Sequence, residues 1–328
     1  MVSTSRGLPR PLGAAVGVVV DELVGEPPAG VHPVGVFGRC MTAVERATYR
    51  DRRAAGVVHA ALGVGMGMGA GAAVGTATAT YVAVAGRELR AVAGSVGAAL
   101  AGHDLERARA LLPSLVGRDV SALDCEGTAR AVVESVAENT VDAVVAPAWW
   151  AATAGAPGAL GYRAANTLDA MVGHRSARYA RFGWASARLD DAAAYVPARL
   201  TAALVALVRP GSAGEVWRAV RDQAPAHPSP NAGVAEAAFA GALGLRLGGD
   251  NRYDGVTDRR PVLGRGRPAC PADIGRAVVL SRDVTRALVV LLAGSGVAAL
   301  GARRRDRRTK PGAARPGARR SGAERWAR

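Results

Sequence analysis

The sequence is poor in aromatic residues, lysine and cysteine, and each shortage excludes a class of protein. Aromatic residues make up 4% of the 328 positions, whereas hydrophobic residues make up 49% and glycine occurs 42 times. Such a composition favours helices that pack closely through small residues over a core of β-strands. The three cysteines (Cys40, Cys125 and Cys270) lie far apart without a CxxC pair, which argues against a disulfide scaffold and a zinc site.

Lysine is nearly absent, so the net charge of +15 comes almost entirely from arginine. Lys310 is the single lysine, and the basic excess is concentrated in residues 303–328. A nucleic-acid-binding protein would interleave basic residues with stacking aromatic side chains, and most of the chain lacks this pattern. We therefore expect no nucleic-acid partner. Residues 303–328 cannot bury a core, and we expect them to form a disordered basic tail.

A long uncharged run predicts that the chain enters a membrane. Residues 56–86 contain no Asp, Glu, Lys or Arg, and the run exceeds the roughly 20 residues that a helix needs to cross a bilayer. Glycine recurs there at every fourth position: Gly63, Gly67, Gly71 and Gly75. This spacing predicts a smooth face for close packing of another helix. A buried soluble helix is the alternative, but glycine costs about 1 kcal/mol against alanine in such a helix.

Other apolar segments are shorter or interrupted. Residues 13–20 begin a first helix, interfacial or membrane-inserted, and prolines force the following loop to be extended. Residues 143–162 are uncharged but contain Pro and Gly, which predicts a kinked span or a re-entrant segment. Residues 200–208, which are too short to span unless residues from 192 onward join them, and residues 287–302 are the last candidates. Residues 40–52 predict a short amphipathic helix, and residues 211–286 a mostly polar region.

We therefore predict an all-α fold, a polytopic integral membrane protein of the cell membrane with three to five spans and polar helical loops. Residues 1–302 would form a single membrane-embedded domain. The basic tail follows the last apolar run directly, so the positive-inside rule indicates a cytoplasmic C-terminus.

Three carboxylates recur at helical spacing within residues 121–147. Glu134, Glu138 and Asp142 follow at i, i+4 and i+8, with Asn139 beside them. Like charges four residues apart destabilise an isolated helix by roughly 0.2–0.5 kcal/mol per pair. A metal ion, a cationic ligand or arginines should therefore offset them, and such oxygen ligands suit Mg²⁺. A solvated helix face with ordinary ion pairs is the alternative.

A second polar group follows the uncharged run directly. Arg163, Asn166 and Asp169 lie at i, i+3 and i+6, close to one helix face. Polar groups are costly next to a membrane and tend to be functional there. An anchor at the membrane interface is the alternative.

The segment around residue 184 combines aromatic, basic and acidic side chains. Trp184 lies among arginines, which is typical of an aromatic belt at a membrane surface or of a site for a flat ligand. Arg188, followed by Asp190 and Asp191, offers a partner for phosphate and oxygen ligands for a metal ion.

Two later segments and the N-terminal loop supply further candidates. Asn231 and Glu236 belong to the run HPSPNAGVAEAAF, and Asn251 and Arg252 to GGDNRYDG. Both runs contain turn-forming residues, so plain connecting loops are the alternative. The N-terminal loop offers acidic residues beside a histidine, without the spacing of a triad or a metal motif. Its candidates are Asp21, Glu26 and His32.

These residues together resemble a known family. The runs VESVAENTVDAVVAP, GAPGALGYRAANTLDAMVG, RYARFGWASARLDD, VPARLTA and HPSPNAGVAEAAFAGALGLRLGG, with NRYDG, resemble the CobD/CbiB family of cobalamin biosynthesis. DELVGEPPAGVHPVGVFGR is similar to the N-terminal signature of that family, except that Glu26 stands where aspartate is common. The resemblance covers roughly residues 16–290, and the basic tail lies outside it.

The resemblance implies a polytopic membrane enzyme, adenosylcobinamide-phosphate synthase. That family uses ATP to join (R)-1-aminopropan-2-ol O-phosphate, or free aminopropanol, to the free propionate of adenosylcobyric acid. Mg²⁺ and ATP are the implied cofactors. The implied partners are this corrinoid, the aminopropanol phosphate, the lipid bilayer and other late cobalamin-assembly membrane enzymes.

We hypothesise three groups of site residues by matching positions to these motifs. The catalytic group is Glu134, Glu138, Asn139, Arg163, Asn166, Asp169 and Arg188. The substrate-binding group is Asp21, His32, Trp184, Asn231, Glu236, Asn251 and Arg252. The metal-binding group is Asp142, Asp190 and Asp191. In this hypothesis the carboxylates hold Mg²⁺–ATP, the arginines bind phosphate, and the asparagines orient corrin amides or the incoming amine.

Two other functions fit a membrane protein of this composition. A non-catalytic sensor of the AmpE-like group could share the fold, but a sensor has no evident need for clustered carboxylates and asparagines. A corrinoid transporter would account for broken helices near the middle of the membrane. It would need more uninterrupted spans than the chain offers.

Overall fold

The computed structural model describes residues 8–27, 32–117, 120–121, 123–174, 176–253 and 256–309. Most of these residues are helical. The helices are α1 (Arg10–Val24), α2 (Pro33–Thr48), α3 (Arg53–Ala72), α4 (Thr76–Ala83), α5 (Gly86–Ala101), α6 (Leu105–Leu111), α7 (Cys125–Thr140), α8 (Ala146–Leu168), α9 (Trp184–Val208), α10 (Ala213–Asp222), α11 (Ala232–Leu243) and α12 (Pro271–Thr309). Short helical turns lie at Leu112–Ser114, Val141–Val145, Asp169–Gly173, Pro210–Ser212 and Ala224–Ala226.

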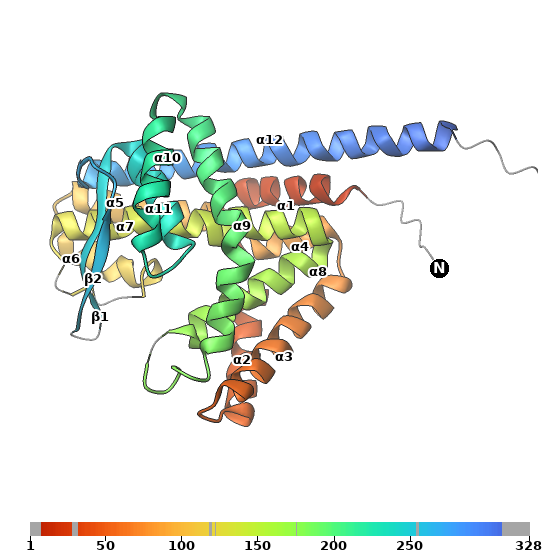
Figure 1. Cartoon of the computed structure of the whole chain (residues 1–328), viewed down its shortest axis with the longest axis horizontal. Coiled ribbons are helices and arrows are strands. Elements are labelled where there is room, and N and C mark those ends of the chain that lie inside the picture. The colour runs from red at the N-terminus through yellow and green to blue at the C-terminus, as the bar shows by residue number, and fades with distance from the viewer. Residues whose placement is uncertain are drawn as a thin grey trace, which may run out of the picture.

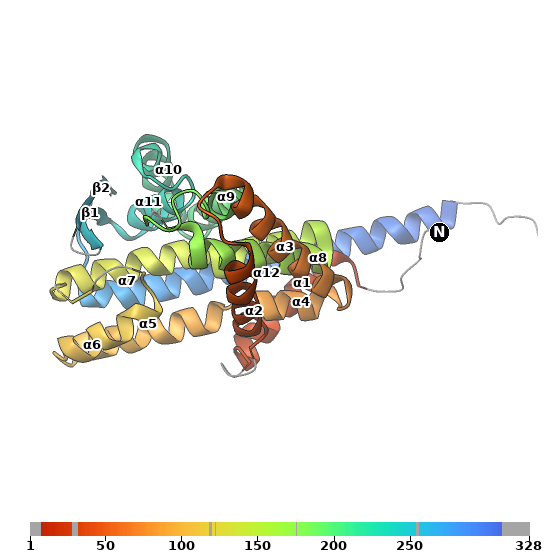
Figure 2. The same ribbon diagram turned by 90° about the horizontal axis from the view of Figure 1, so that it is seen from below.

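The helices run in two main directions. Figure 1 shows α1, α5, α7 and α12 along the long axis of the molecule, whereas α9 runs across them. Figure 2 shows α5, α7 and α12 side by side in the perpendicular view, and both α5 and α7 contact α12. Helix α11 is surrounded by α7, α9 and α10, and nearly all of its side chains are buried. This junction places the start of α11 next to α9.

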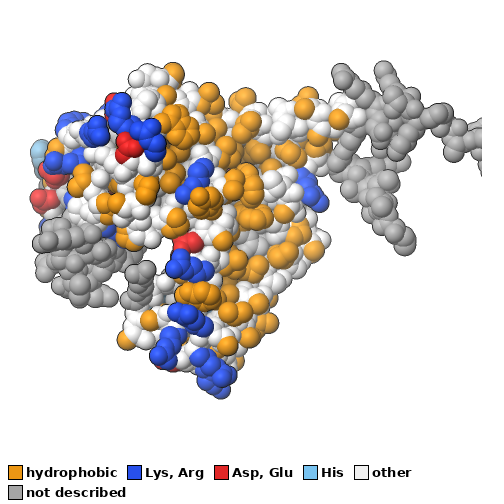
Figure 3. All heavy atoms as spheres, in the orientation of Figure 1, with side chains coloured by type: hydrophobic (Ala, Val, Ile, Leu, Met, Phe, Trp, Pro, Cys, Tyr) orange, Lys and Arg blue, Asp and Glu red, His pale blue; other side chains and the backbone are white. Residues whose placement is uncertain are grey.

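The prediction of an all-α membrane protein is confirmed. Within the described residues, three helices are long and apolar enough to cross a bilayer: Arg53–Ala72, Trp184–Val208 and Pro271–Ala302. Figure 3 shows hydrophobic side chains over much of the surface, with charged side chains gathered mainly over α10 and near the lower tip formed by α2 and α3.

The uncharged run 56–86 divides into two helices, of which α3 is long and apolar enough to cross a bilayer. Helix α3 ends at Ala72, and α4 begins at Thr76 after an extended Gly75. The glycine face is confirmed for the part that lies inside α3. A Cβ added at Gly67 would lie 2.6 Å from the carbonyl oxygen of Leu160, so α3 and α8 touch through their backbones.

The uncharged run 143–162 is broken, as predicted. A π-helical turn, Val141–Val145, leads into α8, and Gly155 inside α8 has a φ of 76°. Only glycine adopts this conformation readily, and Pro157 follows it, so α8 bends there. Whether this segment spans the membrane or re-enters it stays a prediction.

Two helix ends differ from the predicted ones. Helix α2 begins at Pro33, earlier than residue 40, because proline is tolerated at the first helical position and His32 caps the helix. Helix α12 continues to Thr309, beyond the boundary that we placed at residue 302. Residues 310–328, the rest of the predicted tail, lie outside the described residues.

The region 211–286 contains a small sheet that the sequence did not predict. Strands β1 (Leu245–Tyr253) and β2 (Val256–Leu263) form an antiparallel hairpin, and β3 (Arg267–Pro268) pairs with β1 in parallel. Leu245, Leu247 and Leu263 are fully buried, so one face of this hairpin belongs to the core. The hairpin packs against α11 and α7, and the sheet is a minor part of a helical fold.

Candidate functional site

An amide between two carboxylates forms the centre of the site. The Asn166 side-chain amide donates to Asp142 Oδ2 at 3.4 Å and to Asp190 Oδ1 at 3.3 Å. The Tyr162 hydroxyl donates to the other oxygen of Asp142 at 3.4 Å. These side chains come from the π-helical turn, α8 and α9, which pack against one another. The fold therefore joins three sequence motifs that are separated along the chain.

Five carboxylates lie around this amide, and we call them the acidic cluster: Glu138, Asp142, Asp169, Asp190 and Asp191. Burial raises the pKa of Asp142, and the charges of Asp190 and Glu138 raise it further. Burial also raises the pKa of Asp169 to about 6, with smaller contributions from Asp191 and Glu138. The carboxylates thus repel one another, so a bound cation would stabilise the cluster.

Two arginines border the acidic cluster. Arg163 lies on α8, and its Nη1 is 3.5 Å from the side-chain oxygen of Asn166. Arg188 is exposed on α9, and its Nη1 lies 3.7 Å from a carboxylate oxygen of Asp191. Their charges are suited to anionic groups such as phosphate, beside carboxylates that are suited to a cation.

The start of α11 is fastened to the same region. Asn231 donates its side-chain amide to the carbonyl oxygen of Asp191 at 2.8 Å and accepts from Arg199 at 3.0 Å. Further along, Glu236 is buried and lies 3.8 Å from His227. Asn231 therefore borders the acidic cluster, whereas Glu236 lies in the buried interior of α11.

The predicted column of carboxylates divides between two environments. Glu134 accepts a hydrogen bond from the backbone N–H of Gly248 at 2.8 Å, so it anchors the hairpin. Asn139 bonds to the carbonyl oxygen of Ser135 on its own helix. Glu138 and Asp142 lie at the other end of the column, in the acidic cluster.

Other predicted site residues have contacts elsewhere. Asp21 accepts from the backbone N–H groups of Gly86 and Arg87 at the start of α5. Trp184 lies under the guanidinium of Arg53 at 5.1 Å. Asn251 and Arg252 belong to β1, and their side chains lie outside the described ones.

His32 lies at the entrance to α2. Its ring accepts from the backbone N–H of Val34 at 3.2 Å, and its other nitrogen is 3.6 Å from Glu26. Burial lowers the pKa of His32, and the charge of Arg163 lowers it further. The N-terminal loop thus lies close enough to Arg163 to be affected by its charge.

Sequence reasoning missed three residues that contact predicted site residues. They are Tyr162, which bonds Asp142; Arg199, which bonds Asn231; and His227, beside Glu236. Each stands inside or directly next to a motif that we singled out. The sequence signals that could have indicated Tyr162 and His227 were a tyrosine next to Arg163 and the histidine of HPSPNAG.

The donor chemistry of the cluster fits Mg²⁺, with an incomplete set of protein ligands. Carboxylate and amide oxygens are the groups that this ion prefers. Among the described residues, no three His, Cys, Asp or Glu side chains converge closely enough to form a ready-made metal site. Mg²⁺ usually keeps several waters and binds substrate phosphates, so one or two carboxylates are sufficient.

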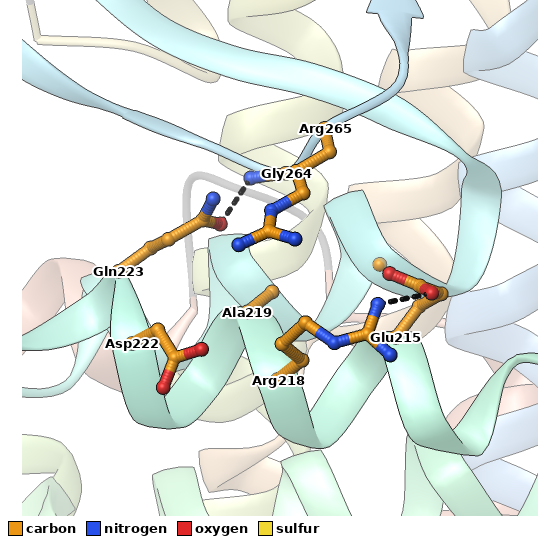
Figure 4. A pocket seen from close by; sticks show the side chains of 8 residues that line it. Glu215, Arg218, Ala219, Asp222, Gln223, Gly264 and Arg265 are labelled. Carbon is orange, nitrogen blue, oxygen red and sulfur yellow. Dashed lines mark hydrogen bonds and ion pairs between the residues drawn. The ribbon is translucent and has the colours of Figure 1, made fainter.

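Two hollows lie outside the acidic cluster. An apolar groove of about 230 Å³ between α2, α3, α4 and α8 includes Arg163 in its wall. A smaller hollow of about 20 Å³ lies between α10 and the hairpin (Figure 4). There Arg218 is paired with Glu215, and Gln223 accepts from the backbone N–H of Gly264 at 2.6 Å. This smaller hollow contains none of the predicted site residues.

Comparisons with known proteins identify the family of this chain. The CobD/Cbib protein family matches residues 14–281, which include the whole acidic cluster. "Cobalamin biosynthesis protein CobD" of Mycobacterium tuberculosis is 51% identical over 296 residues, covering 86% of this chain and 94% of the relative. The protein of that name from Chromobacterium violaceum is 44% identical over 283 residues, covering 81% of this chain and 90% of the relative. No solved structure matches the chain. The chain therefore belongs to the CobD/CbiB family.

Proposed function

We propose that this chain acts in cobalamin biosynthesis as a membrane-bound ligase. In this proposal it uses ATP to join (R)-1-aminopropan-2-ol O-phosphate to the free propionate of adenosylcobyric acid, giving adenosylcobinamide phosphate. The observation that carries the proposal is the Asp142–Asn166–Asp190 arrangement, bordered by Arg163 and Arg188. Family membership supports the pathway, and the site chemistry supports the reaction class.

Amide formation from a carboxylate requires activation of the acid. In the proposed sequence a propionate oxygen takes the γ-phosphoryl group of ATP, and ADP leaves. The amine nitrogen then attacks the carbonyl carbon of the acyl phosphate, inorganic phosphate leaves, and the nitrogen loses one proton. Arg163 and Arg188 would neutralise phosphate charge during these steps.

The acidic cluster would supply the remaining functions. Asp169 is suited to accept the proton of the amine, because its pKa of about 6 lies close to neutral pH. Asn166 would hold the carboxylates of Asp142 and Asp190 in a fixed orientation. These two carboxylates would hold Mg²⁺, which supplies charge neutralisation for the nucleotide phosphates.

A direct assay tests the proposal. Membranes containing the protein are incubated with adenosylcobyric acid, aminopropanol phosphate and Mg–ATP, and the product is measured by mass spectrometry. We expect adenosylcobinamide phosphate from the wild type, a large loss with Asp190→Asn, and little change with Asp222→Asn, an exposed residue of α10. A transporter or a sensor would yield no product, and near-normal turnover by Asp190→Asn would contradict the proposed site.

A further inference from the structure

The groove between α2, α3, α4 and α8 has almost entirely apolar walls. Phe37, Met66, Val82 and Leu160 contribute to them from the four helices. Thr167 is one of the few polar residues there, and its hydroxyl donates to the carbonyl oxygen of Arg163 at 2.7 Å. The volume of about 230 Å³ is sufficient for a segment of an alkyl chain.

The groove opens on an exposed apolar surface of a helix that is suited to cross the bilayer. Helix α3 is one of the three helices suited to cross the bilayer. Met66 of the groove is 44% exposed and Val36 is 43% exposed, and Val58 and Leu62 extend the exposed apolar surface along α3. Water in such a groove would be unfavourable, whereas acyl chains from the bilayer can fill it at low cost.

Arg163 gives the groove a charged group with unused hydrogen-bonding capacity. Its Nε is buried without a hydrogen-bond partner, and the hydrogen bond from its Nη1 to the side-chain oxygen of Asn166 is long at 3.5 Å. The carboxyl groups of Glu26 and Asp142 interact electrostatically with Arg163. Burial raises the pKa of both carboxyl groups. The first turn of α2 lies in the same wall and presents the positive end of a helix dipole.

We propose that this groove binds one acyl chain of an anionic phospholipid, whose phosphate pairs with Arg163. Basic pockets between membrane helices are suited to anionic head groups, because the lipid supplies both the apolar chain and the compensating charge. Binding itself does not depend on the proposed ligase reaction. If Arg163 also binds a substrate phosphate, the lipid head group and the substrate would compete for one guanidinium.

Photo-crosslinking in nanodiscs tests the proposal with the full-length chain. The probes are phosphatidylglycerol and phosphatidylcholine that carry a diazirine on one acyl chain, and adducts are located by peptide mass spectrometry. We expect adducts on the groove residues of α2 and α3, with an excess of about fivefold for phosphatidylglycerol. Arg163→Gln should reduce this excess to near unity while acyl-chain adducts remain.

A matched pair of variants distinguishes lipid bound in the groove from lipid bound elsewhere on the apolar surface. Ala70→Phe would fill the groove, whereas Ala61→Phe adds the same bulk at an exposed position of α3 outside it. We expect loss of groove adducts only with Ala70→Phe, while both variants keep the wild-type elution profile in detergent. Equal adducts with both variants, or an unchanged lipid preference with Arg163→Gln, would overturn the proposal.

Discussion

At the scale of single residues, the side chain of Asn166 connects two carboxylates of the acidic cluster that come from different elements. One amide nitrogen bonds to carboxylates from the π-helical turn and from α9. Without this donor, the two carboxylates would lose the group that bonds to both, and the Tyr162 hydroxyl would still bond to Asp142 alone. We predict that Asn166→Ala lowers kcat/KM by about 10- to 100-fold, as expected when a group that orients ligands is lost. Steady-state kinetics of product formation measures this effect.

The control for Asn166→Ala lies on the same helix. Thr153→Ala removes an exposed hydroxyl that bonds only to backbone oxygens of its own helix. We expect nearly unchanged kinetics for this variant. If both variants behaved alike, the contacts of Asn166 would have no special importance for turnover.

The raised pKa of Asp169 predicts an acid limit to activity. Folding raises this pKa from 3.8 to about 6, so the carboxylate gains a proton as the pH falls through about 6. The protonated form neither accepts a proton nor attracts a cation, so turnover should fall below that pH. Because the folded chain holds this proton more tightly than the unfolded chain, ionisation of Asp169 lowers stability as pH rises from about 4 to about 6.

Comparing pH–rate profiles tests the assignment to Asp169. Asp169→Asn should have low activity at all pH values and should lack the decrease near pH 6. Asp51→Asn, which alters an exposed carboxylate in a loop, should keep the wild-type profile. A wild-type-shaped acid limit in Asp169→Asn would assign the titration to another group.

The residue types of the site were predictable from the sequence, but their orientations were not. Spacing correctly indicated that Glu138 and Asp142 face a common region. It also placed Glu134 with them, although this carboxylate bonds to Gly248 of the hairpin. Glu134 and Asp142 are eight residues apart, about 12 Å along a helix axis, so side chains on one face reach different neighbours that spacing alone cannot identify.

At the scale of elements, the contact between α3 and α8 depends on glycine. A methyl group on Gly67 would collide with the Leu160 carbonyl, whereas a methyl group on Gly65 meets nothing within 4 Å. We predict that Gly67→Ala lowers the free energy of unfolding by about 1–3 kcal/mol. Gly65→Ala should be neutral or stabilising by up to about 1 kcal/mol.

Unfolding in detergent, followed by tryptophan fluorescence, measures both glycine variants. Both variants replace glycine with alanine in α3, so the difference between their free energies of unfolding measures the effect of packing against α8. Equal stabilities would mean that α3 and α8 do not touch as closely as their backbones indicate.

Hydropathy predicted which segments form apolar helices better than it predicted where those helices end. It does not detect the turn at residues 73–75, because Gly75 continues the four-residue glycine pattern while the backbone becomes extended. The hairpin was missed for a different reason. Leu245, Leu247 and Leu263 are buried, but glycine and charged residues interrupt the alternation of β1. Its packing against α7 and α11 therefore decides its structure, which is a tertiary effect.

At the scale of the whole molecule, the directions of the helices restrict how it sits in a membrane. Helix α9 runs across α12 in Figure 1, although both are long and apolar enough to span. The two helices therefore cannot both cross one flat bilayer close to its normal. The exposed apolar side chains Val290 (72% exposed) and Val297 (62% exposed) favour lipid contact along the later part of α12.

The basic tail predicts which end of α12 faces the cytoplasm. Residues 303–328 contain eleven Lys and Arg against two acidic residues, so we expect a cytoplasmic tail. A single crossing by α12 then places Cys270, just before its start, on the opposite side. Single-cysteine chains, with Cys270 alone or Ser321→Cys alone, can be labelled in intact cells with a membrane-impermeant maleimide. We expect labelling at 270 but not at 321. Protection of both positions would mean that α12 lies along the membrane, and labelling of 321 alone would reverse the predicted orientation.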